Sequence, residues 1–346
     1  MEFKKSTMSL ILKPTQRCNF SCTFCSSTEI SKSNKRVDDL DLNKVQQFLD
    51  RFPDTETIII NGGDPLMMDP DYYWQILGML KKRKMTDCVI SFTTNLWDYH
   101  LHPQKWIKLF SHSQVRVATS FQYGGGRDIK PGVPFTEDIF LSIIDKFYKD
   151  FGYKPSFIAV ITDENKHLAI DNVRLAKWLD VDCKLNYAMA SGREGQPFPV
   201  GEMYQIYMDI YEAGLSEWEY STRQMIAKLK GDDFTTCPLN RKCDEGIRNL
   251  QPVGDTGYEY GSCGAFGDDQ EYPIDFKREM EGEFFKPLQT TFEIQYQKEE
   301  CLTCSNFTIC NGCYKTVRDL KKANLVEHSC KQMKSFRERA KTNGLC

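Results

Sequence analysis

The sequence predicts an α/β protein: a partial (β/α)6 barrel followed by a cysteine-rich C-terminal region. Six short apolar runs alternate with helical patterns over about 180 residues, which is typical of parallel strands joined by right-handed crossovers. Six such units are too few to close an eight-unit barrel. Eight of the 14 cysteines fall between Cys237 and Cys330, which separates a cysteine-poor body from a cysteine-rich module.

Each predicted strand is a short run rich in aliphatic or β-branched residues, and each predicted helix has apolar residues at helical spacing. The strands are expected at residues 8–13, 57–61, 88–94, 115–120, 156–162 and 183–189. The helices are expected at residues 41–50, 72–82, 103–110, 135–148 and 168–179, with two more between 201 and 230 and one at 314–324. The domains follow as 1–200 for the barrel, 201–235 for bridging helices and 236–346 for the cysteine-rich domain.

Composition narrows the class of protein. Over 346 residues, 40% are hydrophobic and 27% are charged, as in soluble globular proteins, and the net charge of −3 gives no basic field for nucleic acid. No apolar run approaches the roughly 18 residues of a membrane span. Because the N-terminus also lacks the apolar region of a signal peptide, we expect a cytoplasmic protein with no membrane or nucleic-acid partner.

Three thiols follow the first predicted strand at C-x3-C-x2-C spacing: Cys18, Cys22 and Cys25. In a reducing compartment they are available as metal ligands. Three thiolates can hold three irons of a 4Fe–4S cluster and leave the fourth iron open to a substrate or cofactor. The alternatives are a structural zinc site or three ordinary thiols, although zinc usually has four ligands and no fourth lies nearby.

This spacing, with the aromatic Phe24 before the last cysteine, resembles the cluster motif of the radical S-adenosylmethionine (SAM) superfamily. The resemblance implies a TIM-like partial barrel that holds the cluster. It also implies that SAM binds to the fourth iron of the cluster, which has no cysteine ligand. It implies that an electron from the cluster breaks the sulfonium C–S bond, and that the resulting 5′-deoxyadenosyl radical abstracts a hydrogen atom from an unactivated carbon. In such enzymes the cofactors carry the difficult chemistry and the protein orients the reactants.

The resemblance also implies a SAM-binding set at the carboxyl ends of the strands. Gly62-Gly63-Asp64-Pro65 is similar to the family's Gly-Gly-Glu-Pro element, which meets the SAM amino group, with Asp64 in place of Glu. Two glycines let a ligand approach the backbone. The set is completed by Asn95 and Ser120 for the carboxylate and ribose, Arg127 for the carboxylate, and Asn186, beside the turn at 191–195, for the ribose or adenine. The alternatives are a simple turn at the glycines and a solvated charge at Arg127.

The C-terminal cysteines resemble a SPASM extension, which carries auxiliary clusters. The resemblance implies two closed 4Fe–4S clusters, one held by Cys237, Cys243, Cys263 and Cys313, the other by Cys301, Cys304, Cys310 and Cys330. Residues 256–263 are expected to form the hairpin that brings Cys263 back. The x2 spacing from Cys310 to Cys313 departs from the usual x3, and two zinc sites are the alternative. Cys88 and Cys183 are expected to be small buried hydrophobes, and Cys346 is given no role.

These resemblances imply oxidative modification of a ribosomally made peptide or a protein, such as a cross-link, a thioether or a desaturation. A flavodoxin or ferredoxin would donate electrons. Because only 17 residues precede Cys18, we expect either a separate peptide-recognition protein or a substrate that binds directly in the open barrel. Gly264 follows Cys263 where sulfatase-maturing relatives have Asp, and no catalytic residue is assigned. The alternatives are a small-molecule dehydrogenase and a non-catalytic iron–sulfur or zinc scaffold.

Overall fold

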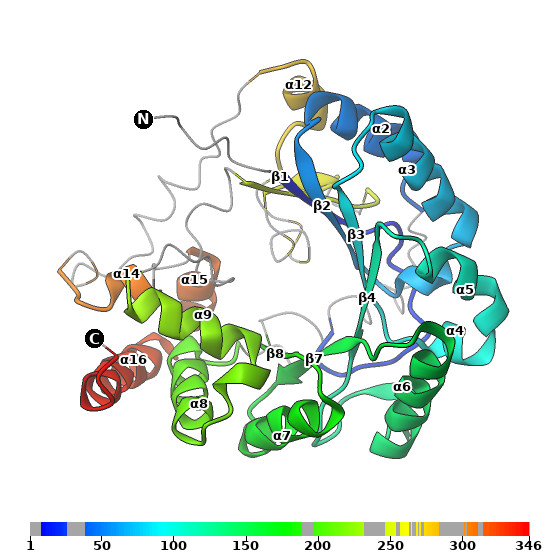
Figure 1. The fold of residues 1–346 in the computed structure, drawn as a ribbon. Coiled ribbons are helices and arrows are strands. Elements are labelled where there is room, and N and C mark those ends of the chain that lie inside the picture. Colours follow the sequence, from blue (N-terminus) through cyan, green and yellow to red (C-terminus); the bar gives the residue numbers. More distant parts are fainter. Residues whose placement is uncertain are drawn as a thin grey trace. The chain divides into compact units, whose positions relative to one another are not determined.

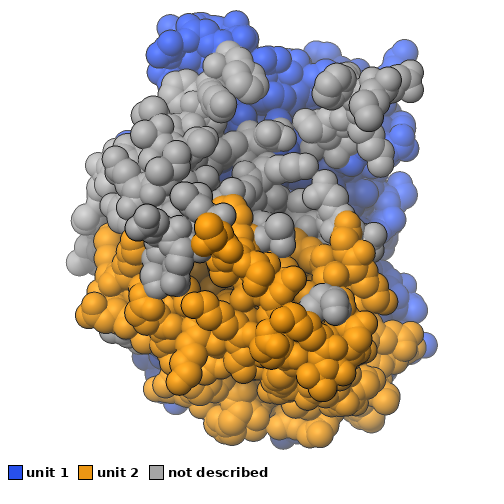
Figure 2. All heavy atoms as spheres, turned by 90° about the vertical axis from the view of Figure 1, so that its left-hand side faces the viewer, with its two compact units in different colours: residues 1–120, 127–155, 243–287 blue, residues 121–126, 156–242, 288–346 orange. Residues whose placement is uncertain are grey.

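The computed structural model describes most of the chain. The residues left undescribed are 1–7, 26–38, 189–196, 232–245, 254–256, 263, 265–267, 269, 271–272, 284–300, 302, 311–313 and 346. The chain divides into two compact units. Unit 1 comprises residues 1–120, 127–155 and 243–287, and unit 2 comprises residues 121–126, 156–242 and 288–346 (Figure 2). Each unit is described by itself.

Unit 1 contains a parallel array of strands with one antiparallel edge. Its strands are β1 (Met8–Leu12), β2 (Thr55–Ile60), β3 (Val89–Thr93), β4 (Val115–Ser120), β9 (Ile247–Leu250) and β10 (Tyr260–Gly261). Their order is β10-β9-β1-β2-β3-β4, and only the β10–β9 pair is antiparallel. Strand β9 pairs in parallel with β1, on the side of β1 that faces away from β2. A short hairpin, β5 (Asp128–Lys130) with β6 (Val133–Pro134), stands apart from this array.

The helices of unit 1 follow the strands in sequence and cover their outer side (Figure 1). They are α2 (Leu42–Arg51), η1 (Pro65–Met67), α3 (Pro70–Lys82), α4 (Trp97–Leu101), α5 (Pro103–Phe110), α6 (Glu137–Phe151) and α12 (Phe276–Met280). Local chemistry sets their starts: the Asp41 side chain accepts the Asn43 N–H at the start of α2, and Thr136 caps α6 in the same way. The strands bury alternate residues such as Leu10 and Leu12, so the core lies between strands and helices.

Unit 2 joins two parallel strands to helices from distant parts of the sequence. Its elements are β7 (Ser156–Ile161), η2 (Lys166–Leu168), α7 (Ala169–Leu179), β8 (Cys183–Tyr187), α8 (Val200–Glu212), η3 (Ser216–Trp218), α9 (Tyr220–Leu229), α14 (Phe307–Cys310), α15 (Tyr314–Lys322) and α16 (Val326–Thr342). Helices α8 and α16 pack side by side (Figure 1). They approach closely at Gly201, whose N–H donates to Ser329 Oγ at 3.0 Å and where a Cβ would overlap the Ser329 carbonyl oxygen.

All six predicted strands and the predicted helices are present, with ends that shift by a few residues. Among the features that the sequence did not predict are helix α4, the β5–β6 hairpin, the pairing of β9 with β1, and the long helix α16. The predicted boundaries at residues 200 and 235 remain a prediction, because compact units need not coincide with domains. In the part of the chain that the structure describes, no helix is both long and apolar enough to cross a bilayer.

Candidate active site

The loop with the three N-terminal thiols follows β1 directly and is held by the rest of unit 1. The Ser21 N–H donates to the Asp128 carbonyl at 2.7 Å. The Phe20 ring packs against Phe135, with ring centroids 5.1 Å apart, and against Trp97 at 6.4 Å. Cys22 is buried, while Cys18 and Cys25 are partly exposed. These contacts fix the loop at the carboxyl end of β1, and ligands of parallel sheets bind at the carboxyl ends of the strands.

The environment of these thiols disfavours their ionised form unless a cation is present. Burial raises the pKa of Cys18, and the nearby carboxylate of Asp64 raises it further. Burial also raises the pKa of Cys22, against the opposing effect of the Arg127 guanidinium. Thiolates in such a place need a positive partner, and a bound metal centre deprotonates a coordinating thiol outright.

The cysteine loop supplies three thiols as donors for a 4Fe–4S cluster. Among the described residues, no three His, Cys, Asp or Glu side chains converge on one point that could hold a metal ion. In a 4Fe–4S cube each thiolate binds a different iron, so the sulfurs need not converge. Cys18, Cys22 and Cys25 are free thiols on one short loop, which is the donor chemistry such a cluster requires.

Gly62 and Gly63 contact residues 13–17, the segment that leads into this loop. The Gly63 N–H donates to the Thr15 carbonyl at 3.0 Å, and the Asp64 N–H donates to the Arg17 carbonyl at 2.8 Å. A Cβ on Gly62 would lie 2.5 Å from the Thr15 oxygen, and one on Gly63 would overlap the Arg17 carbonyl. These two N–H groups are therefore used within the protein. The glycines let residues 13–17 lie directly on the segment after β2.

Asp64 links the ends of two strands. Its carboxylate accepts the Leu66 N–H at 2.9 Å, the Thr94 hydroxyl at 3.0 Å and the Asn95 N–H at 2.8 Å. The side chain is buried, and this burial raises the pKa of Asp64 to about 6 although the hydrogen bonds favour the ionised form. Asp64 thus fixes the segment after β3 relative to the segment after β2.

Two further side chains of the predicted SAM set meet the cysteine loop. Asn95 donates from Nδ2 to Oδ1 of Asn19, one residue after Cys18, at 2.7 Å. Arg127 donates to Ser120 Oγ at 2.9 Å, and its guanidinium lies 5.3 Å from the centre of the Phe24 ring. Because Arg127 also lies close enough to lower the pKa of Cys22, the structure brings Ser120, Arg127 and the loop together.

The remaining predicted residues belong to unit 2 or lie outside the described residues. Asn186 is on β8 in unit 2, partly exposed. Of the cysteines predicted to hold auxiliary clusters, Cys301, Cys304, Cys310 and Cys330 form no disulfide and are partly exposed in unit 2. Cys237, Cys243, Cys263 and Cys313, together with the turn at 191–195, lie outside the described residues. Cys88 and Cys183 are buried, as expected.

Lys13 is a polar residue of the site edge that the sequence did not single out. It follows β1, and its side chain is only 5% exposed. Its ammonium lies 2.5 Å from the Asp268 carboxylate and donates to the Gly264 carbonyl at 3.2 Å. The sequence signal for this residue was its place between an apolar strand and the cysteine loop. A lysine is usually solvated, so this position alone did not indicate a buried ion pair.

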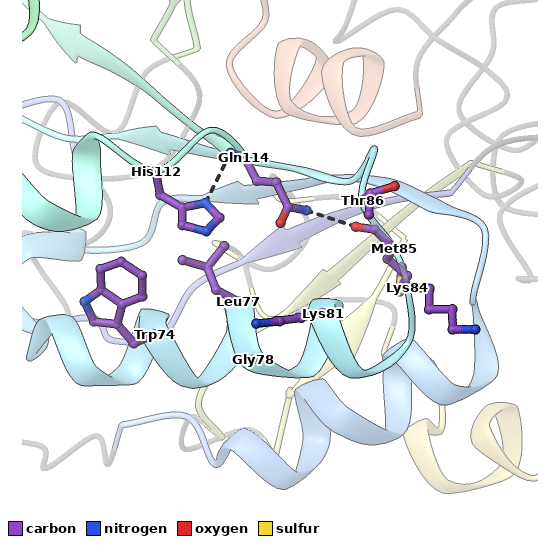
Figure 3. Close-up of a pocket in the computed structure, with 9 residues that line it drawn as sticks. All are labelled: Trp74, Leu77, Gly78, Lys81, Lys84, Met85, Thr86, His112 and Gln114. Atoms are coloured by element: carbon purple, nitrogen blue, oxygen red, sulfur yellow. Dashed lines mark hydrogen bonds between the residues drawn. The ribbon is translucent and has the colours of Figure 1, made fainter.

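A pocket of about 430 Å³ lies elsewhere in unit 1. It is lined by Trp74, Leu77, Gly78, Lys81, Lys84, Met85, Thr86, His112 and Gln114 (Figure 3). These residues come from α3 and from the segments that precede β3 and β4, at the amino ends of those strands. None of the predicted site residues lines it, so it is distinct from the candidate active site.

Comparison with known proteins agrees with this geometry. Residues 12–175 match the model of the Radical SAM superfamily. No curated protein matches the chain. Among solved structures, the chain is similar to anSMEcpe with bound AdoMet, at 15% identity and a TM-score of 0.68, over 98% of this chain and 95% of that one. It is also similar to Streptococcus suis SuiB bound to precursor peptide SuiA, at 15% identity and a TM-score of 0.60, over 88% of this chain and 71% of that one.

At such identities the likeness shows the fold, and it confirms the predicted α/β class with a partial barrel. Because the match to anSMEcpe covers nearly the whole chain, the shared fold includes the cysteine-rich C-terminal region. The family match begins at the last residue of β1 and spans the cysteine loop, Gly62-Gly63-Asp64 and Arg127. Residues 12–175 therefore form a radical SAM domain, and the resemblance indicated by Cys18, Cys22 and Cys25 is confirmed.

Proposed function

We propose that this chain is a radical SAM enzyme that oxidatively modifies a peptide or protein. The observation that carries the proposal is the contact of residues 15–17, which lead directly into the Cys18–Cys25 loop, with Gly62-Gly63-Asp64, at the carboxyl ends of the strands and within the matched domain. When bound, a 4Fe–4S cluster and SAM supply the electron and the radical that abstracts hydrogen from an unactivated carbon. The protein's part is to hold, orient and shield these groups.

The described residues divide this work. Cys18, Cys22 and Cys25 hold the cluster. Arg127, fixed by Ser120 and placed over Phe24, offers a guanidinium to the SAM carboxylate. The Asn95 amide and the backbone carbonyls of the Gly62-Gly63 segment, rather than its N–H groups, provide polar contacts for the rest of the methionyl group. Asp64 orients Asn95 by accepting a hydrogen bond from the Asn95 backbone N–H.

The C-terminal cysteines provide the second part of the proposal. We assign Cys301, Cys304, Cys310 and Cys330 to one auxiliary 4Fe–4S cluster and Cys237, Cys243, Cys263 and Cys313 to another. Three clusters correspond to about 12 iron atoms per chain. A cluster held by these cysteines would accept the electron that the substrate radical loses, and a flavodoxin or ferredoxin would serve as the external electron donor.

A peptide substrate is supported by two of the similar structures. One is anSMEcpe with bound AdoMet and Cp18Cys peptide, at 15% identity and a TM-score of 0.66. The other is the SuiB complex with its precursor peptide SuiA. Both describe peptides held by proteins of this fold, and we extend that substrate class to this chain.

The test is SAM cleavage by the reconstituted protein. We expect anaerobic incubation with dithionite and SAM to yield 5′-deoxyadenosine, and we expect Cys22→Ala to abolish it. Cys88→Ala, at a buried thiol outside the site, is the matched control and should retain it. A wild-type protein with a verified N-terminal cluster that forms no 5′-deoxyadenosine overturns the proposal. Mass spectrometry of candidate peptides for the loss of two hydrogens then tests the substrate class.

A further inference from the structure

We propose that Lys13 is a positioning residue that holds Gly264 and Asp268, which follow Cys263 in the sequence, against the residues that lead into Cys18. The inference rests on the proposed function, because it concerns two segments that we assign to different clusters. The ion pair itself joins residues that are 255 positions apart in the sequence and belong to the same compact unit.

The backbone around Lys13 is fixed by the sheet. The Lys13 N–H donates to the Leu250 carbonyl of β9 at 2.9 Å. A Cβ on Gly62 would lie 3.2 Å from the Lys13 Cβ, so the glycine leaves space for the lysine stem. The Lys13 side chain therefore starts between β9 and the segment after β2, and its ammonium extends from there to Asp268.

The charge of Lys13 needs its partner. A buried ammonium is costly unless it is paired and hydrogen-bonded. Lys13 has a carboxylate and a carbonyl within reach, and both belong to the segment that follows Cys263. Asp268 is 29% exposed, so its carboxylate forms the outer half of the pair. The positions of Gly264 and Asp268 are thus tied to the burial of Lys13.

Packing of Gly264 on the sheet gives independent support. A Cβ on Gly264 would lie 3.5 Å from Ile11 Cδ1 and 3.9 Å from Asn249 Oδ1, so this residue rests over β1 and β9. Ile11 and Asn249 are partners in the β1–β9 register. Because Gly264 is adjacent to Cys263 and Lys13 lies five positions before Cys18, the contact connects both cysteine segments through β1.

The experiment is a double-mutant cycle with Lys13→Met and Asp268→Asn, both close in shape to the native residues. The readouts are hydrogen–deuterium exchange of a peptide spanning residues 264–268 and iron per chain, measured on anaerobically purified protein. If one ion pair holds the segment, either single variant should raise exchange about tenfold and the double variant should add little, since both remove the same interaction. Iron should fall from about 12 to about 8 atoms as one auxiliary cluster is lost.

Lys105→Met is the matched control, because it breaks the Lys105–Asp98 ion pair elsewhere in unit 1. It should change neither readout. Unchanged exchange in Lys13→Met, additive effects in the double variant, or faster exchange with full iron content each overturns the inference. These readouts do not depend on turnover. If the wild type forms no 5′-deoxyadenosine, the proposed function is wrong. The hydrogen exchange and iron content still test the role of the ion pair in that case.

Discussion

The Asp64 carboxylate accepts the Thr94 hydroxyl at 3.0 Å, which joins the segment after β2 to the end of β3. The same carboxylate accepts the backbone N–H groups of Leu66 and Asn95. A carboxylate, with two oxygens and no proton, is suited to three donors that converge from two strand ends. Asp64 therefore fixes the two strand ends at the edge where we propose that SAM binds.

We expect Asp64→Asn to destabilise the fold by about 1–3 kcal/mol, because an amide NH2 cannot accept the buried Asn95 N–H. Urea unfolding of the variant measures this. Asp71→Asn, at an exposed position in the first turn of α3, is the control, and its effect should stay within about 0.5 kcal/mol. Equal midpoints for the two variants would show that the hydrogen bonds to Asp64 contribute nothing.

Two glycines of unit 1 should respond oppositely to alanine. At Gly63 the new methyl would overlap the Arg17 carbonyl, so Gly63→Ala should displace the cysteine loop and lower the iron content. At Gly78, in the middle of α3, a Cβ would meet no atom within 4 Å. Gly78→Ala should therefore raise the unfolding free energy by about 0.5–1 kcal/mol through helix propensity. Iron analysis and chemical denaturation test the pair, and full iron in Gly63→Ala would contradict the close approach.

Glu219 should give a pH dependence to stability. Its fully buried carboxylate accepts the Leu185 N–H at 2.9 Å and the Ser221 N–H at 3.0 Å at the start of α9. Burial raises the pKa of Glu219 above its ordinary value of 4.5, so the folded state holds the proton more tightly than the unfolded state. The unfolding free energy should then fall as pH rises from 4.5 through the folded pKa.

Glu219→Gln removes this titration. Urea unfolding of wild type and variant across that pH range measures the difference in slope, and we expect the wild type to be the steeper of the two. Parallel pH profiles would rule out a raised pKa for this carboxyl.

Arg127 should set the affinity for SAM. Arg127→Lys keeps the positive charge but loses the planar fork that contacts Ser120 and lies over Phe24. We expect the Kd for SAM to rise about tenfold, as for the loss of one charge-assisted hydrogen bond. Equilibrium dialysis measures the Kd, with Arg174→Lys on α7 as a surface control. An unchanged Kd would remove Arg127 from the binding set.

The C-terminal thiols should account for part of the iron. Cys330→Ala removes one of the four described cysteines that we assign to an auxiliary cluster, and iron should fall by about four atoms per chain. Cys183→Ala, at a fully buried thiol on β8, should leave the iron content unchanged. Zinc in place of iron in the wild-type protein would instead support the alternative ligand set.

Much of the fold could be predicted because its signals are local. The strands are short apolar runs with alternating burial, as in Ile58 and Ile60 on β2, and the helices have caps such as Asp41. The spacing of Cys18, Cys22 and Cys25 is local as well. Even the glycines were recognised, although the structure shows that they admit the protein's own backbone.

What could not be predicted depends on partners far away in the sequence. Strand β9 has only four residues, including Arg248 and Asn249, and lacks the apolar run that marks the other strands. Its buried Arg248 is matched by Glu279 at 2.6 Å, a pairing that no spacing rule indicates. The contact between Lys13 and Asp268 is of the same kind. Such interactions emerge only when the sheet brings separate segments together.

The parallel pairing of β1 with β9 has a consequence for synthesis of the chain. Ile11 lies opposite Asn249, so β1 is synthesised long before β9, the strand that covers this side of it. Until then its N–H and C=O groups form an open template for a neighbouring nascent chain. Ribosome-bound intermediates that stop before residue 247 should therefore be the aggregation-prone species.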